Sequence, residues 1–307
     1  MSKDLRIIFL GTPDFASTTL RNLVENNINV VAVITAPDKP KGRGKKLGIS
    51  AVKEYALEAD LPILQPTNLK SPQFLEELKS YKADLQIVVA FRMLPVAVWD
   101  MPRLGTFNLH ASLLPQYRGA APINWAIING EKETGVTTFF LKHEIDTGAI
   151  IYQEKEPIED SDDIGSLYSK LMNRGADLVL KTVKAIEKGD YPQIDQEASS
   201  DLKSAPKIFK NDCKIDWNQS SEVVRNFIRG LSPYPAAWTE LNGKTLKIFK
   251  TEVTNEKSNQ DLKLFQSDGK TFLNAKTNDG MLSITELQLE GKKRMTVEEF
   301  LRGNKID

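Results

Sequence analysis

Three mainly apolar runs, at positions 6–10, 30–34 and 85–90, constrain the fold of this 307-residue chain more than any other feature. A strand that is apolar at nearly every position is typically buried on both faces, as parallel strands covered by helices are. An amphipathic helical pattern between residues 14 and 24 separates the first two runs. Strand, helix and strand at this spacing indicate a right-handed βαβ unit. The sequence therefore predicts an α/β fold with a Rossmann-like parallel sheet.

The pattern changes twice in the second half of the chain. Residues 164–188 are typical of a long amphipathic helix that covers one face of the sheet. Residues 191–206 are polar and aperiodic, and short alternating strands with glycine turns follow from residue 207. We therefore predict a Rossmann-like domain over 1–190, a linker over 191–206 and a small OB-like β-barrel over 207–307.

Composition excludes several classes of protein. No run of about 18 apolar residues is present, so we expect no membrane span. The first residues lead directly into a strand rather than a secretory signal, and the single cysteine excludes an internal disulfide. We therefore expect a cytoplasmic protein, and we expect it to be a monomer. With two histidines and one cysteine, the chain has few ligands for a metal, and we predict none.

The segment after the first strand excludes a dinucleotide-binding dehydrogenase. Such a site requires G-x-G-x-x-G at this point, but the chain has Gly-Thr-Pro-Asp at positions 11–14. Pro13 removes an amide where a phosphate would need a donor. The glycines at 42, 44 and 48 have the wrong spacing and follow the second strand. We therefore predict no nicotinamide cofactor.

A further strand, at residues 107–110, presents two polar side chains on one face. Asn108 and His110 are two residues apart, and side chains at that spacing share a face of a strand. Such a pair is usually only the polar face of a half-buried strand. However, ligands of open α/β sheets bind beyond the carboxyl ends of the strands, where this pair lies. The pair is therefore a candidate site.

The residues around this pair resemble a known signature. Positions 108–119 read Asn-x-His-x-Ser-Leu-Leu-Pro-x-x-Arg-Gly, which is similar to the signature of the folate-dependent formyltransferases. That family moves a formyl group from formyl-tetrahydrofolate to an amine, so the resemblance implies 10-formyltetrahydrofolate as the co-substrate. The family also carries Asp-x-Gly further along, which Asp146 and Gly148 match here. By this resemblance Asn108, His110 and Asp146 form the catalytic trio, although Asp-Thr-Gly alone is typical of a turn.

These three residue types suit formyl transfer to an amine. Because an α-amino group has an ordinary pKa of about 8, it must lose a proton before it attacks, and His110 can accept that proton. Asn108 offers an N–H to the formyl oxygen, an effect of about 3–4 kcal/mol in other acyl-transfer sites. Asp146 would orient His110 and stabilise its protonated form. We interpret the second histidine, His143, as a surface residue.

The predicted folate site follows the catalytic strand. Ser112, Leu113, Leu114 and Pro115 offer an apolar wall together with backbone amides and carbonyls, which suits a flat heteroaromatic ring. By itself this tetrapeptide is typical of a packing turn. In the family the end of the preceding strand also helps to wall the pterin pocket. Many relatives have Tyr-Gly where this chain has Phe-Arg at 91–92, so the direction of the Arg92 side chain is open.

The densest basic segment of the chain, residues 39–46, follows the second predicted strand. Five of its eight residues are cationic, and composition alone is typical of a mobile solvated loop. In formyltransferases that act on initiator methionyl-tRNA, a similar loop enters the acceptor arm. By resemblance, Arg43 is therefore a candidate tRNA contact, and so are Lys45 and Lys46, because cationic side chains bind phosphate.

The favoured function is formyl transfer from 10-formyltetrahydrofolate to the methionine of initiator methionyl-tRNA. The alternative is a formyltransferase for an amino-sugar nucleotide or another small amine, which would keep the catalytic trio without needing the basic segment. A third reading is a catalytically idle RNA-binding protein, against which the intact trio argues.

Overall fold

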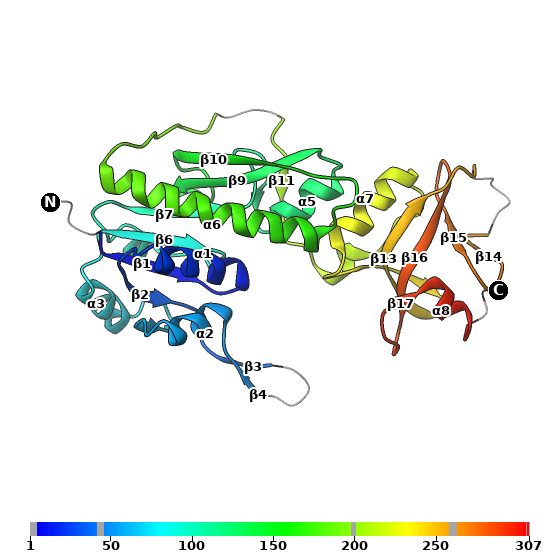
Figure 1. Ribbon diagram of the computed structural model, residues 1–307, viewed down its shortest axis with the longest axis horizontal. Coiled ribbons are helices and arrows are strands. Elements are labelled where there is room, and N and C mark those ends of the chain that lie inside the picture. Colours follow the sequence, from blue (N-terminus) through cyan, green and yellow to red (C-terminus); the bar gives the residue numbers. More distant parts are fainter. Residues whose placement is uncertain (1–4, 42–45, 198–200, 258–262, 305, 307) are drawn as a thin grey trace. The chain divides into compact units, whose positions relative to one another are not determined.

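The computed structural model of the protein describes residues 5–41, 46–197, 201–257, 263–304 and 306. Its chain forms two compact units (Figure 1). The first unit comprises residues 1–118, 135–156 and 169–203, and the second comprises 119–134, 157–168 and 204–307. No helix of the described residues is long and apolar enough to cross a membrane.

A seven-stranded sheet forms the centre of the first unit, in the order β10-β9-β7-β6-β1-β2-β5. The strands from β7 to β5 are parallel to their neighbours, whereas β9 is antiparallel to β7. The bounds are β1 Ile7–Gly11, β2 Val30–Ile34, β5 Ile63–Leu64, β6 Leu85–Val89, β7 Thr106–His110, β9 Glu133–Phe140 and β10 Ile150–Pro157. Every residue of β1 and β6 is buried, which confirms the Rossmann-like parallel sheet predicted from the apolar runs.

Helices cover both faces of this sheet. On one face, Ile8 and Leu10 of β1 pack in a core cluster with Phe74 and Leu78 of α3 and with Val98 of α4. On the other face α6 runs over β7 and β9, where the Thr182 and Thr138 hydroxyls lie 2.9 Å apart. The helices are α1 Asp14–Glu25, α2 Ala51–Glu58, α3 Pro72–Ser80, α4 Val96–Trp99 and α6 Ile164–Lys188.

Gly175 of α6 allows this helix to lie close to β7. A Cβ at position 175 would come within 2.8 Å of a methyl group of Leu109, which is too short for an ordinary contact. Leu109 lies between Asn108 and His110 in sequence and is itself buried. The close approach of α6 therefore seals the apolar side of β7 and fixes the strand that carries both polar side chains.

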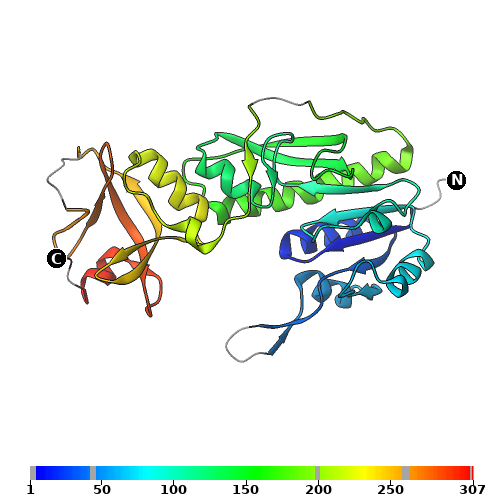
Figure 2. The same ribbon diagram turned by 180° about the vertical axis from the view of Figure 1, so that it is seen from behind.

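The basic segment forms a short hairpin at the carboxyl end of β2. Its strands are β3 Lys39–Lys41 and β4 Lys46–Gly48, which pair antiparallel with Pro40 opposite Leu47. These two strands are referred to below as the β3–β4 hairpin, and Figure 2 shows them extending from the sheet edge where β2 ends. Composition indicated a loop here, so the strand pairing is additional information from the structure.

The second unit is built on a curled antiparallel sheet in the order β12-β13-β16-β15-β14, with β17 paired to β16. Its core joins β-strand residues to α7 and α8, as Ile248, Ile284, Ile228 and Phe300 illustrate. This half-barrel agrees with the predicted small OB-like fold. The helices are α5 Pro122–Ile128, α7 Ser221–Leu231 and α8 Val297–Leu301. The strands are β12 Ala237–Leu241, β13 Lys244–Val253, β14 Phe265–Ser267, β15 Leu273–Lys276, β16 Met281–Leu289 and β17 Met295–Thr296. The connections contain three short elements: β8 Arg118–Gly119, β11 Ser204–Ala205 and the 3-10 turn η1 Lys210–Cys213.

Candidate active site

The candidate catalytic pair lies in the last three residues of β7. Asn108 is half-buried, and His110, the final residue of the strand, is only 6% exposed. The pairing places Asn108 opposite Val88 of β6, and His110 opposite Thr137 of β9. Within the described residues the Asn108 side chain has no hydrogen-bond partner, so its amide remains able to bind a ligand. An amide in this state is uncommon beside a well-packed core.

The ring of His110 is held from the opposite side. Its Nε2 lies 2.9 Å from the carbonyl oxygen of Tyr117. Because a carbonyl oxygen can only accept a hydrogen bond, Nε2 carries the proton, and Nδ1 of the neutral ring is an acceptor. Nδ1 lies 3.9 Å from Oδ2 of Asp146, which is too long for a hydrogen bond but close enough for the carboxylate to attract the ring once the ring is protonated. The carbonyl group of Tyr117 thus fixes the orientation of the His110 ring, and Nδ1 of that ring faces the carboxylate of Asp146.

Asp146 reaches this position on a tightly folded segment, residues 141–149. Leu141 N donates to Thr106 O at the beginning of β7, and Phe140 N donates to Ala149 O as the chain returns. A Cβ at Gly148 would lie 1.5 Å from the carbonyl oxygen of Phe140, so no other residue fits at this point. Asp146 itself has a φ of 55°, in the left-handed region that aspartate tolerates better than most residues. The glycine of Asp-x-Gly is therefore required by the close approach of two backbone segments.

Two further residues hold the segment that carries Asp146. Gln196 Nε2 donates to the carbonyl oxygens of Asp146 and Gly148, at 2.9 and 2.8 Å. Its Oε1 accepts hydrogen bonds from Nε and Nη2 of Arg118, at 3.1 and 2.6 Å. The arginine of the signature therefore acts through Gln196 on the backbone next to Asp146. Gln196 falls in the polar stretch 191–206, where periodicity gives no signal, and sequence reasoning missed it.

The predicted folate-binding tetrapeptide serves largely as a support. The Ser112 hydroxyl is fully buried and donates to Gln116 O, and its carbonyl oxygen accepts from Thr137 Oγ1. Leu114 is buried, and its backbone bonds to side chains of Thr137 and Gln153. Leu113 and Pro115 are half-buried. The side chains of Leu113 and Pro115 are thus the accessible members of this set.

The side chain of Arg92 points toward the connection between β5 and α3. Its guanidinium donates to the carbonyl oxygens of Pro66 and Thr67, the latter at 3.2 Å. The neighbouring apolar side chains Met93 and Val96 are 74% and 45% exposed. The bulky replacement at position 92 therefore ties two loops together, and the apolar surface beyond β6 comes from the residues that follow it.

The predicted tRNA contacts are only partly described. Arg43 and Lys45 lie outside the described residues, and only the backbone of Lys46, in β4, is described. The other histidine, His143, is exposed, as predicted, and packs edge-on against Trp99 with 5.4 Å between the ring centroids.

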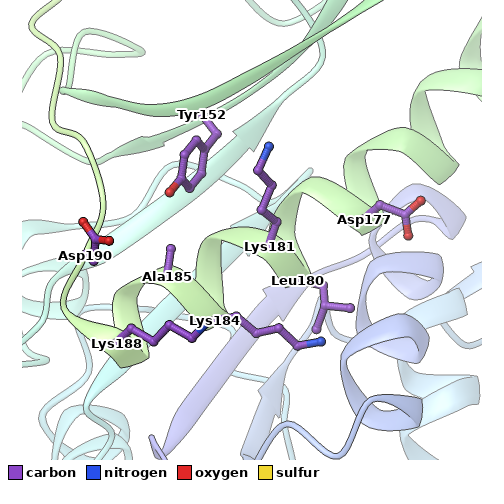
Figure 3. Close-up of a pocket in the computed structure, with 8 residues that line it drawn as sticks. All are labelled: Tyr152, Asp177, Leu180, Lys181, Lys184, Ala185, Lys188 and Asp190. Atoms are coloured by element: carbon purple, nitrogen blue, oxygen red, sulfur yellow. The ribbon is translucent and has the colours of Figure 1, made fainter.

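A surface pocket of about 480 Å³ lies elsewhere on the first unit, between α6 and β10 (Figure 3). Three lysines of α6 line it, and Lys181 stacks over the ring of Tyr152 at 4.9 Å. None of the catalytic trio contributes to it, so this pocket is separate from the candidate active site. Among the described residues, no group of three His, Cys, Asp or Glu side chains is arranged to hold a metal ion.

Comparison with known proteins agrees with the class of enzyme that this site suggests. Residues 5–183 match the family described as "Formyl transferase", and residues 207–305 match "Formyl transferase, C-terminal domain". The chain belongs to the formyl transferase family. It is similar over nearly its whole length to proteins named methionyl-tRNA formyltransferase. One from Bacteroides fragilis is 56% identical, with 98% of this chain and 95% of the relative covered; one from Flavobacterium johnsoniae is 54% identical, with 97% and 96% covered.

Solved structures are similar in fold at lower identity. An N-formyltransferase from Helicobacter canadensis, in complex with folinic acid and dTDP-3-aminofucose, has a TM-score of 0.69 and 23% identity, with 95% of this chain and 100% of that one covered. HypX from Aquifex aeolicus, in complex with tetrahydrofolic acid, has a TM-score of 0.64 and 23% identity, with 99% of this chain and 49% of that one covered. At these identities the likeness concerns the fold alone.

Proposed function

We propose that this protein transfers the formyl group of 10-formyltetrahydrofolate to the α-amino group of methionine on initiator methionyl-tRNA. The observation that carries this proposal is the Asn108 amide, which has no hydrogen-bond partner among the described residues and shares a strand end with an imidazole whose Nδ1 is left as an acceptor. This arrangement offers a donor for a carbonyl oxygen and an acceptor for an amine proton within one site. Relatives that are 51–57% identical carry the matching name.

His110 handles the proton in the proposed reaction. The amine nitrogen forms a bond to the formyl carbon, and Nδ1 of His110 accepts the proton that the amine loses. The adjacent Asp146 carboxylate, 3.9 Å away, stabilises the imidazolium that results. When the bond between the formyl carbon and the folate nitrogen breaks, the same proton passes to that nitrogen. The bonds and protons balance without a covalent enzyme intermediate.

Asn108 stabilises the charge that develops during this step. As the amine adds, negative charge gathers on the formyl oxygen, and the Asn108 amide can donate a hydrogen bond to it. Since the amide has no partner among the described residues, it need not break another bond first. An amide donor in this role contributes about 3–4 kcal/mol to transition-state stabilisation.

The strand ends beside this pair have a surface that suits the formyl donor. Leu113 and Pro115 follow β7, and the exposed Met93 and Val96 follow β6, the neighbouring strand. Apolar side chains with backbone amides between them suit a flat pterin ring. We propose that Ser112 and Leu114 contribute through the backbone that they support rather than through their side chains. The donor supplies the formyl group, and these residues hold and orient it.

The basic segment supplies the contact that a tRNA acceptor requires and a small amine does not. We propose that Arg43, Lys45 and Lys46 bind the acceptor end of the tRNA, with cationic side chains on phosphates. Their segment leaves the carboxyl end of β2, on the same edge of the sheet as the end of β7. RNA bound there would lie at the edge where its methionyl group must react.

The test is an assay with labelled 10-formyltetrahydrofolate and two kinds of acceptor. Initiator methionyl-tRNA and a panel of amino-sugar nucleotides are offered separately, and the tRNA reaction is repeated with Arg43→Ala. We expect transfer to the tRNA and a sharp loss in the variant. Transfer to a sugar amine alone would contradict the tRNA assignment but keep the chemistry, and no transfer to any acceptor would favour an idle RNA-binding protein.

A further inference from the structure

A closed set of polar side chains surrounds the base of the β3–β4 hairpin. It consists of Thr35, Asp38, Ser50, Lys53 and Gln65, which we call the hairpin-base network. Thr35 and Asp38 lie between β2 and β3, Ser50 and Lys53 follow β4, and Gln65 follows β5. The network therefore joins the chain entering the hairpin to the chain leaving it, and joins both to the neighbouring strand.

An ion pair forms the centre of this network. Lys53 Nζ lies 2.5 Å from Asp38 Oδ2, and the two side chains are only 18% and 17% exposed. Gln65 bonds to both partners: Lys53 Nζ donates to its Oε1 at 2.7 Å, and its Nε2 donates to Asp38 Oδ1 at 2.8 Å. Gln65 Nε2 also donates to the carbonyl oxygen of Ala36. Both carboxylate oxygens of Asp38 are thus hydrogen-bonded, and both side chains are more buried than those of a typical surface ion pair.

A second contact fixes the other side of the hairpin base. The hydroxyls of Thr35 and Ser50 lie 2.7 Å apart, and Thr35 is fully buried. Ser50 Oγ also accepts from Lys53 N and caps the first turn of α2. Because α2 packs against α1, the cap ties the outgoing chain to the body of the unit. Both ends of the hairpin are therefore anchored to rigid elements.

Arg92 extends the network to the strand beside the candidate active site. It holds the carbonyl oxygens of Pro66 and Thr67, which directly follow Gln65 in the chain. Arg92 comes three residues after the end of β6, the strand that pairs with β7. The segment that follows β6 is thus hydrogen-bonded, through Arg92, to the two residues next to Gln65 in the chain, and Gln65 belongs to the hairpin-base network.

The hairpin itself provides little to fix its own direction. Each strand has three residues, and a short two-stranded hairpin is marginally stable alone. Among the described helices and strands, β3 and β4 have extensive contacts only with each other. Leu47, opposite Pro40 in the hairpin, is 70% exposed. The direction of the hairpin must therefore be set at its base.

We propose that Asp38, Lys53 and Gln65 are positioning residues that hold the β3–β4 hairpin where it can meet the acceptor end of a tRNA, and that Arg92 links this support to the active-site edge. This inference rests on the proposed function, because it assigns a role in RNA binding to residues that contact no RNA. It differs from a purely stabilising role, since it requires selective loss of tRNA recognition when the network is broken.

The experiment compares Lys53→Met with the wild-type protein in steady-state formylation of initiator methionyl-tRNA. We expect the KM for the tRNA to rise about tenfold, while kcat and the KM for the formyl donor stay within about twofold. We also expect trypsin to cut within residues 41–46 about fivefold faster in the variant without RNA, because the hairpin samples more directions. Lys132→Met is the matched control: Lys132 also pairs with an aspartate, Asp160, but on an exposed surface outside the hairpin.

A second variant covers the case in which Lys53→Met fails to fold because it leaves the Asp38 carboxylate unpaired. The double variant Asp38→Asn/Lys53→Met carries no unpaired charge and is expected to behave in the same way. Three results would each overturn the proposal. The first is an unchanged KM for the tRNA, and the second is an equal impairment of kcat, of the KM for the tRNA and of the KM for the formyl donor. The third is a higher KM for the tRNA without faster cleavage by trypsin. If the wild-type protein does not formylate methionyl-tRNA, the proposed function fails and this inference fails with it, an outcome distinct from the others.

Discussion

The ends of β7 and β2 lie on the same edge of one sheet, but their polar side chains are arranged in opposite ways. At the end of β2 the side chains of Asp38, Lys53 and Gln65 bond to one another and leave little free capacity. At the end of β7, Asn108 has no partner among the described residues, and His110 presents an acceptor nitrogen at a distance from Asp146. A closed network supports a structure, whereas an open set of donors and acceptors is available for chemistry.

The largest expected effect comes from Asn108→Asp, which tests the open side of this comparison. The variant keeps the shape of the side chain but replaces a donor with a negatively charged acceptor. We expect kcat for formyl transfer to fall about 100-fold to 1,000-fold, since the charge on the formyl oxygen would lose its donor. The measurement is single-turnover formylation of methionyl-tRNA.

The control for this variant is Asn68→Asp. Asn68 is exposed, and its Oδ1 accepts from Lys70 N, a bond that a carboxylate can also accept. We expect Asn68→Asp to retain wild-type turnover and both variants to retain the wild-type melting temperature. Near-normal turnover in Asn108→Asp would remove the assigned role of Asn108.

Gln196→Leu tests whether the open site depends on a support of its own. The change removes both bonds to the backbone at Asp146 and Gly148 and leaves Arg118 without this acceptor. We expect kcat to fall about tenfold with both KM values within about twofold, because a displaced carboxylate affects the transition state more than binding.

Gln288→Leu is the matched control, since Gln288 also donates to a loop carbonyl, that of Lys292, but in the second unit. A loss of activity in Gln288→Leu equal to that in Gln196→Leu would indicate general damage rather than a specific support. An unchanged kcat in Gln196→Leu would show that Asp146 is positioned by other contacts.

The sequence predicted the structure best where residues close together in the chain determine it. The apolar runs at β1, β2 and β6 predicted the parallel sheet, and in the structure the side chains of Ser50 and Thr296 cap the helices that follow them directly. These features are local, because burial and capping depend on residues close together in the chain. The 3.6-residue period likewise predicted α6 over residues 164–188.

The supports of the site were hidden from sequence because they join distant positions. Gln196 lies 78 residues after Arg118, and Gln65 lies 27 residues after Asp38, so neither pair has a local pattern. The bounds of a short edge strand such as β14, Phe265–Ser267, are also difficult to derive from sequence. Short edge strands have weak periodicity, and their bounds depend on the partner strand.

Asp38→Asn tests the closed side of the comparison through pH. Hydrogen bonds from Gln65 and Lys53 lower the pKa of Asp38 below its ordinary value. A lowered pKa in the folded state means that the carboxylate stabilises the fold above the unfolded pKa of about 3.9, and that this contribution is lost as the pH falls through the folded pKa. We therefore expect the variant to unfold at lower urea concentration than the wild type at pH near 7, and the two midpoints to converge in acid.

The control is Asp160→Asn, which removes an exposed pair with Lys132 and should shift the urea midpoint less at neutral pH. A midpoint difference between Asp38→Asn and the wild type that stayed constant into acid would contradict the ionic character of the hairpin-base network. In that case the hairpin-base network would stabilise the fold through hydrogen bonds and packing, without a contribution from the charge of Asp38.

The smallest effect is expected from His143→Ala, which asks whether the second histidine has any part in the chemistry. His143 is exposed on the segment that carries Asp146, and its ring contacts the edge of Trp99 rather than a group of the candidate site. We expect kcat and both KM values to stay within about twofold of the wild type, and His110→Ala to lose activity by at least about 100-fold in the same assay. A comparable loss in both variants would mean that proton transfer is shared, and that the chemistry extends beyond the open end of β7.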